Sequence, residues 1–391
     1  MKKHLSIFFA ITLSSLLFAA ETFSFTPIVN EIYTSREVSL ANNYVADYST
    51  FFSILANPAN AALTGDKKLF PYISADMTGE LAKAYDLVRL FSSGDTTELS
   101  QYISEMTDIP INVNMSGPLC FGSVKNNFEI SFFNSTYSAG TLRGTDDTSL
   151  YAGEQYLFNL TYAYPIKFGK SALAIGLGGF GFVDLQGIYE GDISDALNYL
   201  NDKTYTFFPL YTTAGFGLNA GMSLSIASVF TLAISWNDFF GGAITQKFDS
   251  TSSLTSFQFT KYKPLGTMPL DSSLVTGFSL DLPLEECTRH FLTQTHIYMQ
   301  YDDINLLFTL KKRGETFSAS MLYETLSFGF EVEMFHTITL RYGMCNDYMA
   351  GGLGLKAGMV HLDVGLYSTK IGFTKNDEGN IGFSLSFGVY Q

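Results

Sequence analysis

Charge, cysteine and long apolar runs are scarce in this sequence, and each scarcity excludes a class of protein. Charged residues make up 15% of the 391 residues, and 23 Lys and Arg against 37 Asp and Glu give a formal charge of -14. That balance argues against the basic surface with which proteins bind nucleic acid. The three cysteines, Cys120, Cys287 and Cys345, are odd in number and far apart, which argues against a disulfide framework and a metal site. We therefore expect no metal, no cofactor and no nucleic-acid partner.

Only the N-terminus carries a long apolar run. Lys2 and Lys3 precede the apolar stretch 5–18, and small residues follow it. This pattern is typical of a secretory signal peptide, which we place at residues 1–20. A helix that anchors the chain in a membrane is the alternative, but the run is short for one. No later run approaches the length of a membrane helix, so any crossing of a membrane must use strands.

Aromatic residues (15%) and glycine (34 residues) are abundant, and the end of the chain shows how they are arranged. Small or polar residues there separate apolar residues at every second position: Ile381, Phe383, Leu385, Phe387 and Val389. A period of two over about ten residues predicts a strand with one apolar face, long enough to cross a bilayer. In lipid such a strand cannot leave its edge unpaired, so it must belong to a closed barrel.

The same alternation recurs along the chain after residue 66. It predicts strands at 69–77, 111–115, 128–132, 158–164, 173–177, 211–226, 230–238, 274–282, 291–300, 304–310, 317–323, 328–334, 337–342, 353–359, 361–367 and 381–389. The short links are 122–127, 167–170, 227–228, 335–336 and 360, and the long links are 78–108, 138–155, 185–208, 241–270 and 343–352. Short turns at one end and long external loops at the other are typical of an outer-membrane barrel.

These patterns predict an all-β fold, a transmembrane antiparallel β-barrel over residues 67–391. A soluble β-sandwich or solenoid would also alternate. The aromatic content, the signal peptide and the asymmetry of the links favour the barrel. Within the long links, helical spacing predicts two short helices between residues 78 and 108 and another at 192–200.

Residues 21–66 show no sustained alternation. Their stretch 48–63 is semi-apolar and is broken at Asn57, because Pro58 forces the residue before it out of the helical region. We expect a bent segment of two short pieces, too apolar to be a free tail.

A bent segment with Asn57-Pro58-Ala59, placed before a barrel that ends the chain, resembles the long-chain fatty-acid transporter (FadL-like) family, most of all its spirochaetal, treponemal members. The resemblance implies a barrel of about 14 strands whose lumen is plugged by residues 21–66. It also implies an outer-membrane channel that captures hydrophobic small molecules, above all fatty acids, and releases them sideways into the membrane. Its partners would then be outer-membrane lipid and the barrel-assembly machinery. A non-specific porin and a non-transport barrel acting as an assembly or secretion partner are the alternatives.

Charged residues gather on the predicted inward faces of the last strands: Glu331, Glu333, Arg341, Lys356, His361 and Asp363. Because these strands are neighbours, the charges can form an ion-pair network in the lumen that offsets their desolvation. Alternatively, Arg341 or Lys356 binds a ligand carboxylate. His361 and Asp363 on one face also suggest catalysis, but no nucleophile signature accompanies them. We therefore expect no catalytic residue and no enzyme.

One predicted strand is rich in glycine: Gly176, Gly178, Gly179 and Gly181 surround Phe180 and Phe182. Glycine within a strand marks a kink, a bulge or a close approach. One interpretation is a break in the wall that serves as a lateral exit, with the two phenylalanines pointing inward beside it; the other is room for the twist or the plug. The residues expected to bind ligand or to gate are Asn57, Pro58, Ala59, Gly178, Gly179, Phe180, Phe182, Arg341 and Lys356.

Overall fold

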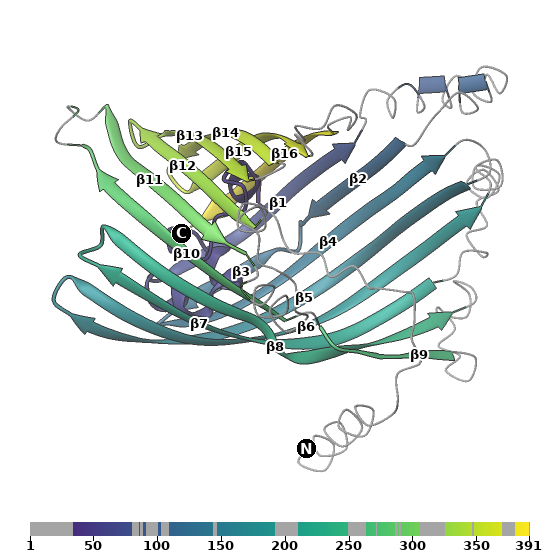
Figure 1. Cartoon of the computed structure of the whole chain (residues 1–391), viewed down its shortest axis with the longest axis horizontal. Coiled ribbons are helices and arrows are strands. Elements are labelled where there is room, and N and C mark those ends of the chain that lie inside the picture. The colour runs from purple at the N-terminus through teal and green to yellow at the C-terminus, as the bar shows by residue number, and fades with distance from the viewer. Residues whose placement is uncertain are drawn as a thin grey trace, which may run out of the picture.

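The computed structural model describes residues 34–79, 86, 89–90, 101–102, 109–143, 147–191, 210–248, 263–270, 272–285, 288, 291–302, 304, 325–345, 348–369 and 380–390. Their strands form one antiparallel sheet that closes on itself (Figure 1). The strands are β1 (Lys67–Gly79), β2 (Ile109–Ser116), β3 (Phe121–Lys125), β4 (Phe128–Arg143), β5 (Asp147–Phe168), β6 (Ser171–Gly191), β7 (Leu210–Ile226), β8 (Phe230–Phe248), β9 (Lys263–Met268), β10 (Ser273–Pro283), β11 (Leu292–Tyr301), β12 (Leu326–Met334), β13 (Ile338–Cys345), β14 (Tyr348–Ala357), β15 (Val360–Thr369) and β16 (Asn380–Tyr390).

The sixteen strands fill fourteen positions of the ring. β2 and β3 lie end to end between β1 and β4, and β9 and β10 both pair with the same edge of β8. The pairing of β8 with β10 completes the ring, so the described part of the chain is a closed 14-stranded antiparallel barrel. The predicted fold class is confirmed. Closure removes the unpaired edges that a sheet in lipid cannot have.

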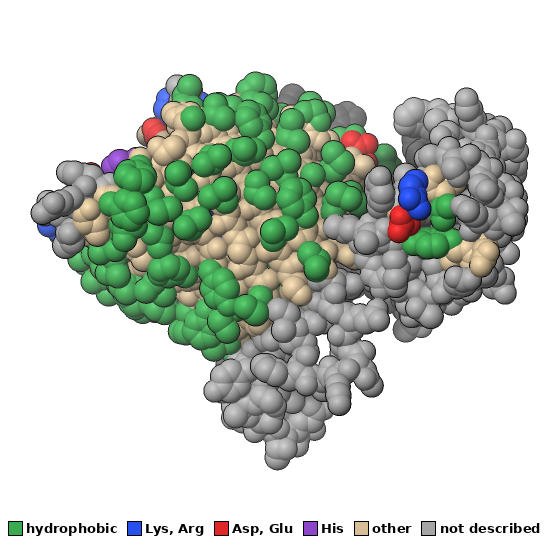
Figure 2. Space-filling view, turned by 90° about the horizontal axis from the view of Figure 1, so that it is seen from above, with side chains coloured by type: hydrophobic (Ala, Val, Ile, Leu, Met, Phe, Trp, Pro, Cys, Tyr) green, Lys and Arg blue, Asp and Glu red, His purple; other side chains and the backbone are tan. Residues whose placement is uncertain are grey.

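The outer surface of the barrel is apolar. In β16, Ile381 and Leu385 are exposed on one face of the strand, whereas Ser384 and Ser386 are buried on the other face. Other strands repeat this alternation, and hydrophobic side chains cover the outer face seen in Figure 2. An apolar belt around a closed ladder matches the hydrocarbon of a bilayer. Among the described residues, no helix is long and apolar enough to cross a membrane.

Tight turns join the strands at one end of the barrel, where short links are predicted. Six turn residues adopt positive φ: Asn126, Asn127, Ala227, Ser228, Phe335 and His336. Gly169 and Gly358 adopt it in two further turns. This left-handed backbone is the conformation of two-residue hairpin turns, whose twist matches that of the flanking strands. The short links predicted at 167–170, 227–228 and 335–336 are therefore confirmed. The link predicted at 122–127 is mostly strand β3, with the turn only at 126–127, and the link predicted at residue 360 is a turn at 358–359, because Val360 begins β15.

Two of the predicted long links are wrong. Residues 138–155 are mostly strand, because β4 and β5 remain paired as far as Arg143 and Asp147. The link 343–352 is likewise filled by the paired strands β13 and β14. Small and polar residues mask the period of two in both places, although the backbone ladder continues through them.

Two predicted strands have no place in the ring. β11 pairs directly with β12, so neither 304–310 nor 317–323 lies between them. Apart from Ile304, which is helical, those two ranges fall outside the described residues, as does the helix predicted at 192–200. The described residues between β1 and β2 are helical, in keeping with the prediction: 86, 89–90 and 101–102.

The wall of the barrel is uneven in height. The strands from β4 to β8 have 16, 22, 21, 17 and 19 residues, whereas those from β10 to β16 have between 8 and 11. About 9–11 residues cross a bilayer. The strands from β4 to β8 are therefore longer than a crossing requires, and Figure 1 shows them running beyond the shorter strands.

Residues 34–66, the described part of the N-terminal segment, pack against inward-facing side chains of the strands. They form α2 (Ser35–Ser39), α3 (Ser53–Ala56) and the 3-10 helix η1 (Pro58–Ala62). Wall glycines lie where the segment comes closest, and a Cβ there would collide with it: Gly122, Gly176, Gly221, Gly343 and Gly352. Glycine lets two backbones approach each other. Much of the glycine in this chain therefore makes room for the segment.

The wall is interrupted between β2 and β3. The β1 ladder pairs Ser74 with Ser116 and resumes at Leu69 and Gly122, and residues 117–121 are skipped. β6, in contrast, pairs continuously with β5 and β7. The break predicted near Gly176 is therefore wrong. Glycine in β6 does not disturb the ladder, whereas the chain between β2 and β3 leaves it.

Candidate functional site

Buried charges tie the N-terminal segment to one side of the lumen. Arg36 on α2 donates from Nε and Nη2 to the Glu331 carboxylate on β12, both at 2.9 Å, and pairs with Asp47 at 2.5 Å. Glu331 also accepts from Arg341 Nε at 2.5 Å, and Arg341 pairs with Asp363 at 2.5 Å. A buried charge that loses its partner costs about 3–5 kcal/mol. Each carboxylate here therefore depends on its arginine.

The network has a further arm on β10 and β11. His296 Nδ1 lies 2.5 Å from Asp281, and its Nε2 lies 3.9 Å from Glu331. In the N-terminal segment, burial alone would raise the pKa of the Asp47 carboxyl. The Arg36 guanidinium beside it holds that pKa below its ordinary value instead. Asp47 is therefore a stable anion that keeps Arg36 in place.

The predicted inward charges divide into two groups. Three belong to the network: Glu331, Arg341 and Asp363. Three lie closer to the tight-turn end: Glu333, Lys356 and His361. Lys356 has no carboxylate partner among the described residues, and His361 packs edge-on against Tyr390 with ring centroids 4.6 Å apart. Arg341 is already shared between two carboxylates, so it does not offer a free guanidinium to a ligand.

The Asn-Pro-Ala turn is fastened to β6 and β7. Asn57 Nδ2 donates to Ser223 Oγ at 3.0 Å, and Asn57 Oδ1 accepts from the Ala59 amide at 3.1 Å. Ser223 Oγ in turn donates to Asn60 Oδ1 at 2.9 Å. The backbone of the turn rests on Gly176. These contacts position the segment against the wall; a role for the motif in gating stays a prediction.

Gly178 and Gly179 lie within the unbroken ladder of β6. A Cβ on Gly178 would contact the Pro58 ring at 3.3 Å, whereas one on Gly179 would meet Leu218 on β7. Gly178 therefore makes room for the N-terminal segment, which is the second of the two interpretations of this strand. Neither glycine interrupts the wall.

Phe180 and Phe182 lie on the inner side of the same strand. Their rings stack with centroids 6.2 Å apart and an interplanar angle of 30°. They cover Gly217 and Gly215 on β7, where a Cβ would come within 2.5 and 2.6 Å of the rings. The result is a flat aromatic surface on the inner wall.

Strand register extends this surface into an apolar row. Residues directly opposite each other on neighbouring strands share one level of the wall. From β4 to β8 one level carries only apolar or small residues: Phe133, Leu157, Phe182, Gly215 and Ala243. We call these five residues the apolar row. Barrel lumens are usually polar, so a continuous apolar row there is unusual.

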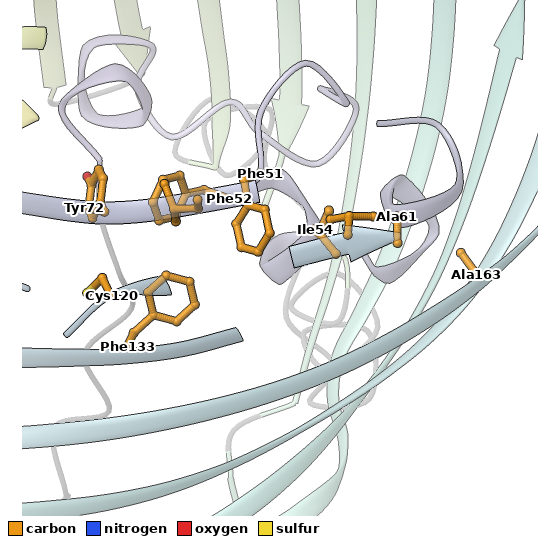
Figure 3. Close-up of a cluster of buried hydrophobic side chains, with 10 residues drawn as sticks. Phe51, Phe52, Ile54, Ala61, Tyr72, Cys120, Phe133 and Ala163 are labelled. Carbon is orange, nitrogen blue, oxygen red and sulfur yellow. The ribbon is translucent and has the colours of Figure 1, made fainter. Parts of the chain in front are cut away.

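The apolar row leads to the interruption in the wall, where rings of the N-terminal segment meet it (Figure 3). The Phe52 ring lies 4.6 Å from Tyr72 on β1 and 5.9 Å from Phe133 on β4. The Phe51 ring lies 6.5 Å from Phe133. Cys120, in the skipped stretch, is fully buried in the same cluster. In this structure the segment therefore closes the interruption from inside.

A polar level runs beside the apolar row, towards the end with the long strands. It crosses seven strands and every member is buried: Ser74, Ser116, Ser135, Gln155, Asp184, Thr213 and Thr245. Tyr137 donates its hydroxyl to both oxygens of Asp184, at 2.9 and 3.0 Å. The inner wall thus places hydrogen-bonding groups next to an apolar track.

Sequence reasoning missed both levels and the position of the interruption. Phe133 and Phe182 are far apart in the chain, and only the register of three strands brings them to one level. The available signals were the Phe51-Phe52 pair in the N-terminal segment and Gly117-Pro118, which interrupts an alternating stretch.

Neither a family model nor a curated protein sequence matches the chain. Several solved structures resemble it: the Pseudomonas putida toluene transporter TodX (TM-score 0.45, 10% identity, 92% of this chain and 98% of that one), the Ralstonia pickettii toluene transporter TbuX (0.43, 10%, 92% and 98%) and the CymD monoaromatic hydrocarbon channel (0.46, 11%, 91% and 97%). These similarities do not assign the chain to a family.

Proposed function

We propose that this protein is a passive channel for hydrophobic small molecules, which move along the apolar row and leave through the interruption between β2 and β3. The observation that carries the proposal is the apolar row itself, one end of which, Phe133 on β4, lies beside the stretch where the ladders of β1 with β2 and β3 skip residues. An apolar ligand gains about 25 cal/mol per Å² of surface removed from water. Rings along the row supply that surface inside an otherwise polar lumen.

The outer side of the interruption supports an exit into lipid. Phe70, Leu119 and Phe121 flank it and are 67%, 55% and 46% exposed on the apolar belt. A ligand that passes Cys120 therefore meets hydrocarbon on both sides and need not enter water. Phe51 and Phe52 fill the inner side, so passage requires them to move.

We also propose where the protein lies in the cell and which segment closes its lumen. Residues 1–20 are removed as a signal peptide, residues 21–66 form the plug, and the barrel lies in the outer membrane after insertion by the barrel-assembly machinery. Long-chain fatty acids are the ligand class that the family resemblance implies. Outer-membrane fractionation and N-terminal sequencing of the mature protein test the location and the cleavage site.

The exit is tested by blocking it at a native thiol. In a Cys287→Ser/Cys345→Ser background, a lipid-soluble maleimide modifies Cys120 when the interruption opens. Modified protein in liposomes should lose at least about tenfold in the rate at which a labelled hydrocarbon enters the bilayer, because the adduct fills the exit. The matched control is the same background with Cys120→Ala, treated with the same reagent.

Transfer that continues unchanged after complete modification of Cys120 would place the exit elsewhere. Ion conductance measured on the same preparations separates the alternatives. A non-specific porin conducts ions without the segment having to move, whereas a plugged channel for hydrophobic molecules does not.

A further inference from the structure

Two buried acceptors stand together where the apolar row meets the polar level. Asp184 and Gln186 project inward from β6, immediately beyond Phe182 on the same face of the strand. They are 0% and 1% exposed. The Tyr137 hydroxyl donates a hydrogen bond shared by the two carboxylate oxygens of Asp184. The site thus combines a ring surface with a carboxylate and an amide at one end.

Gln186 has an unsatisfied acceptor. Its Oε1 is buried and accepts no hydrogen bond from any described residue. A buried polar atom without a partner costs about 1–3 kcal/mol, so native proteins seldom leave one. An oxygen with this environment needs a donor. The neighbouring Asp184 carboxylate can also only accept hydrogen bonds. A ligand group that donates a hydrogen bond therefore fits both residues.

A carboxylate does not fit this position. Asp184 would repel it, and the two arginines of the charge network, Arg36 and Arg341, are each shared between two carboxylates. A cation at the same level of the wall is Lys247 on β8, whose ammonium lies 5.7 Å from the centroid of the Tyr211 ring. Gln186 on β6 lies opposite Tyr211 on β7, which lies opposite Lys247 on β8. The backbones of Gln186 and Lys247 are therefore two strand spacings apart, about 10 Å.

We propose that Asp184 and Gln186 form the head-group pocket of the channel and select hydrophobic molecules that carry a hydroxyl over those that carry a carboxylate. The apolar body lies along Phe182 and Leu157, and the hydroxyl donates to Gln186 Oε1 or to the Asp184 carboxylate. This rests on the proposed function and narrows its ligand class. A site of this kind disfavours the fatty acids that the family resemblance implies as ligands.

The test is equilibrium binding to the purified full-length protein in detergent at about pH 8, where a fatty acid is ionised. Three labelled probes share one alkyl chain: dodecanol, dodecyl methyl ether and dodecanoate. Dodecanol should bind about tenfold more tightly than the ether, because the ether accepts but cannot donate, and dodecanoate should bind most weakly. Gln186→Met and Asp184→Asn should each lower dodecanol affinity about fivefold and leave the ether unchanged.

Gln246→Met is the matched control, because Gln246 lies on the outward side of β8, and it should change no affinity. Ether and dodecanol binding equally well would overturn the head-group pocket while leaving the channel intact. Tight dodecanoate binding that is lost in Lys247→Met would overturn it in favour of a carboxylate site. Failure of all three probes to bind would instead overturn the channel. The comparison of probes on the wild-type protein holds even where a variant fails to fold.

Discussion

At the scale of single residues, glycine determines how the N-terminal segment and the wall fit together. Gly221 on β7 shows this most clearly. A Cβ there would lie 1.9 Å from Asn57 Oδ1 and 3.1 Å from the Pro58 ring. Because Asn57 also forms hydrogen bonds with Ser223 and with the Ala59 amide, it cannot move away from this Cβ without breaking them.

We therefore expect Gly221→Ala to displace the Asn-Pro-Ala turn, at a cost of about 2–3 kcal/mol, which is typical of overpacking a rigid contact. Gly181→Ala is the control, since its Cβ would make only an ordinary 3.8 Å contact with the Gly215 carbonyl. Hydrogen exchange of residues 53–64 measures the displacement. Equal protection in both variants would contradict the contact.

A second prediction at this scale concerns pH. Burial raises the pKa of Glu37 from 4.5 to about 7, although its hydrogen bond from the Thr34 amide opposes the shift. Between pH 4.5 and about 7, the Glu37 carboxyl is protonated when the segment is docked and ionised when it is undocked. Docking should therefore weaken as pH rises through this window, by about 3 kcal/mol once above it.

Glu37→Gln should remove this dependence, because the amide does not titrate. Hydrogen exchange of α2 at pH values on either side of the window, corrected for intrinsic exchange rates, gives the difference between the two proteins. The amides of β5 serve as the internal control. A wild-type profile that matches the variant would show that Glu37 is not the titrating group.

At the scale of elements, the order of turns and strands sets the orientation in the membrane. Tight turns lie at one end and the extensions of β4 to β8 at the other. Polar extensions beyond the apolar belt need water, and barrels direct their longer connections outward. We therefore expect the ends of the long hairpins to face the cell exterior.

Epitope tags inserted after residue 145 and after residue 255 should be accessible to antibody on intact cells. A tag inserted after Ser228, in the tight turn between β7 and β8, should be accessible only after lysis. None of the three sites lies within a strand of the described residues, so the tagged barrels should fold. The reverse pattern of accessibility would invert the orientation and place the head-group pocket at the wrong end for capture from outside.

At the scale of the whole molecule, the barrel and the segment are stabilised in different ways. Strand pairing closes the ring without help from residues 34–64. The segment is held by the Arg36 ion pairs, by the Asn57 contacts and by the Phe51 and Phe52 rings. The barrel should therefore survive loss of the segment.

Deletion of residues 34–64 should leave a folded barrel that still migrates as a heat-modifiable species, with ion conductance in planar bilayers raised at least about tenfold. The lumen then loses the side chains that fill it. Arg36→Met is the intermediate control, since it removes the ion pairs and keeps the segment. Unchanged conductance after the deletion would place the segment outside the conducting path.

The sequence by itself determined the barrel and its tight turns. Phe383 and Leu385 alternate with serine, and residues 227–228 separate two alternating stretches, because strand period and the length of a turn are local properties. It also indicated that Glu331, Arg341 and Asp363 face inward. Only the tertiary structure decided where the wall is interrupted and which residues share a level. Phe133, Leu157 and Phe182 meet through strand register, and Arg36 meets Glu331 through the path of a segment 295 residues away in the chain. No local pattern records such distant pairings, since they are fixed by the closure of the whole ring.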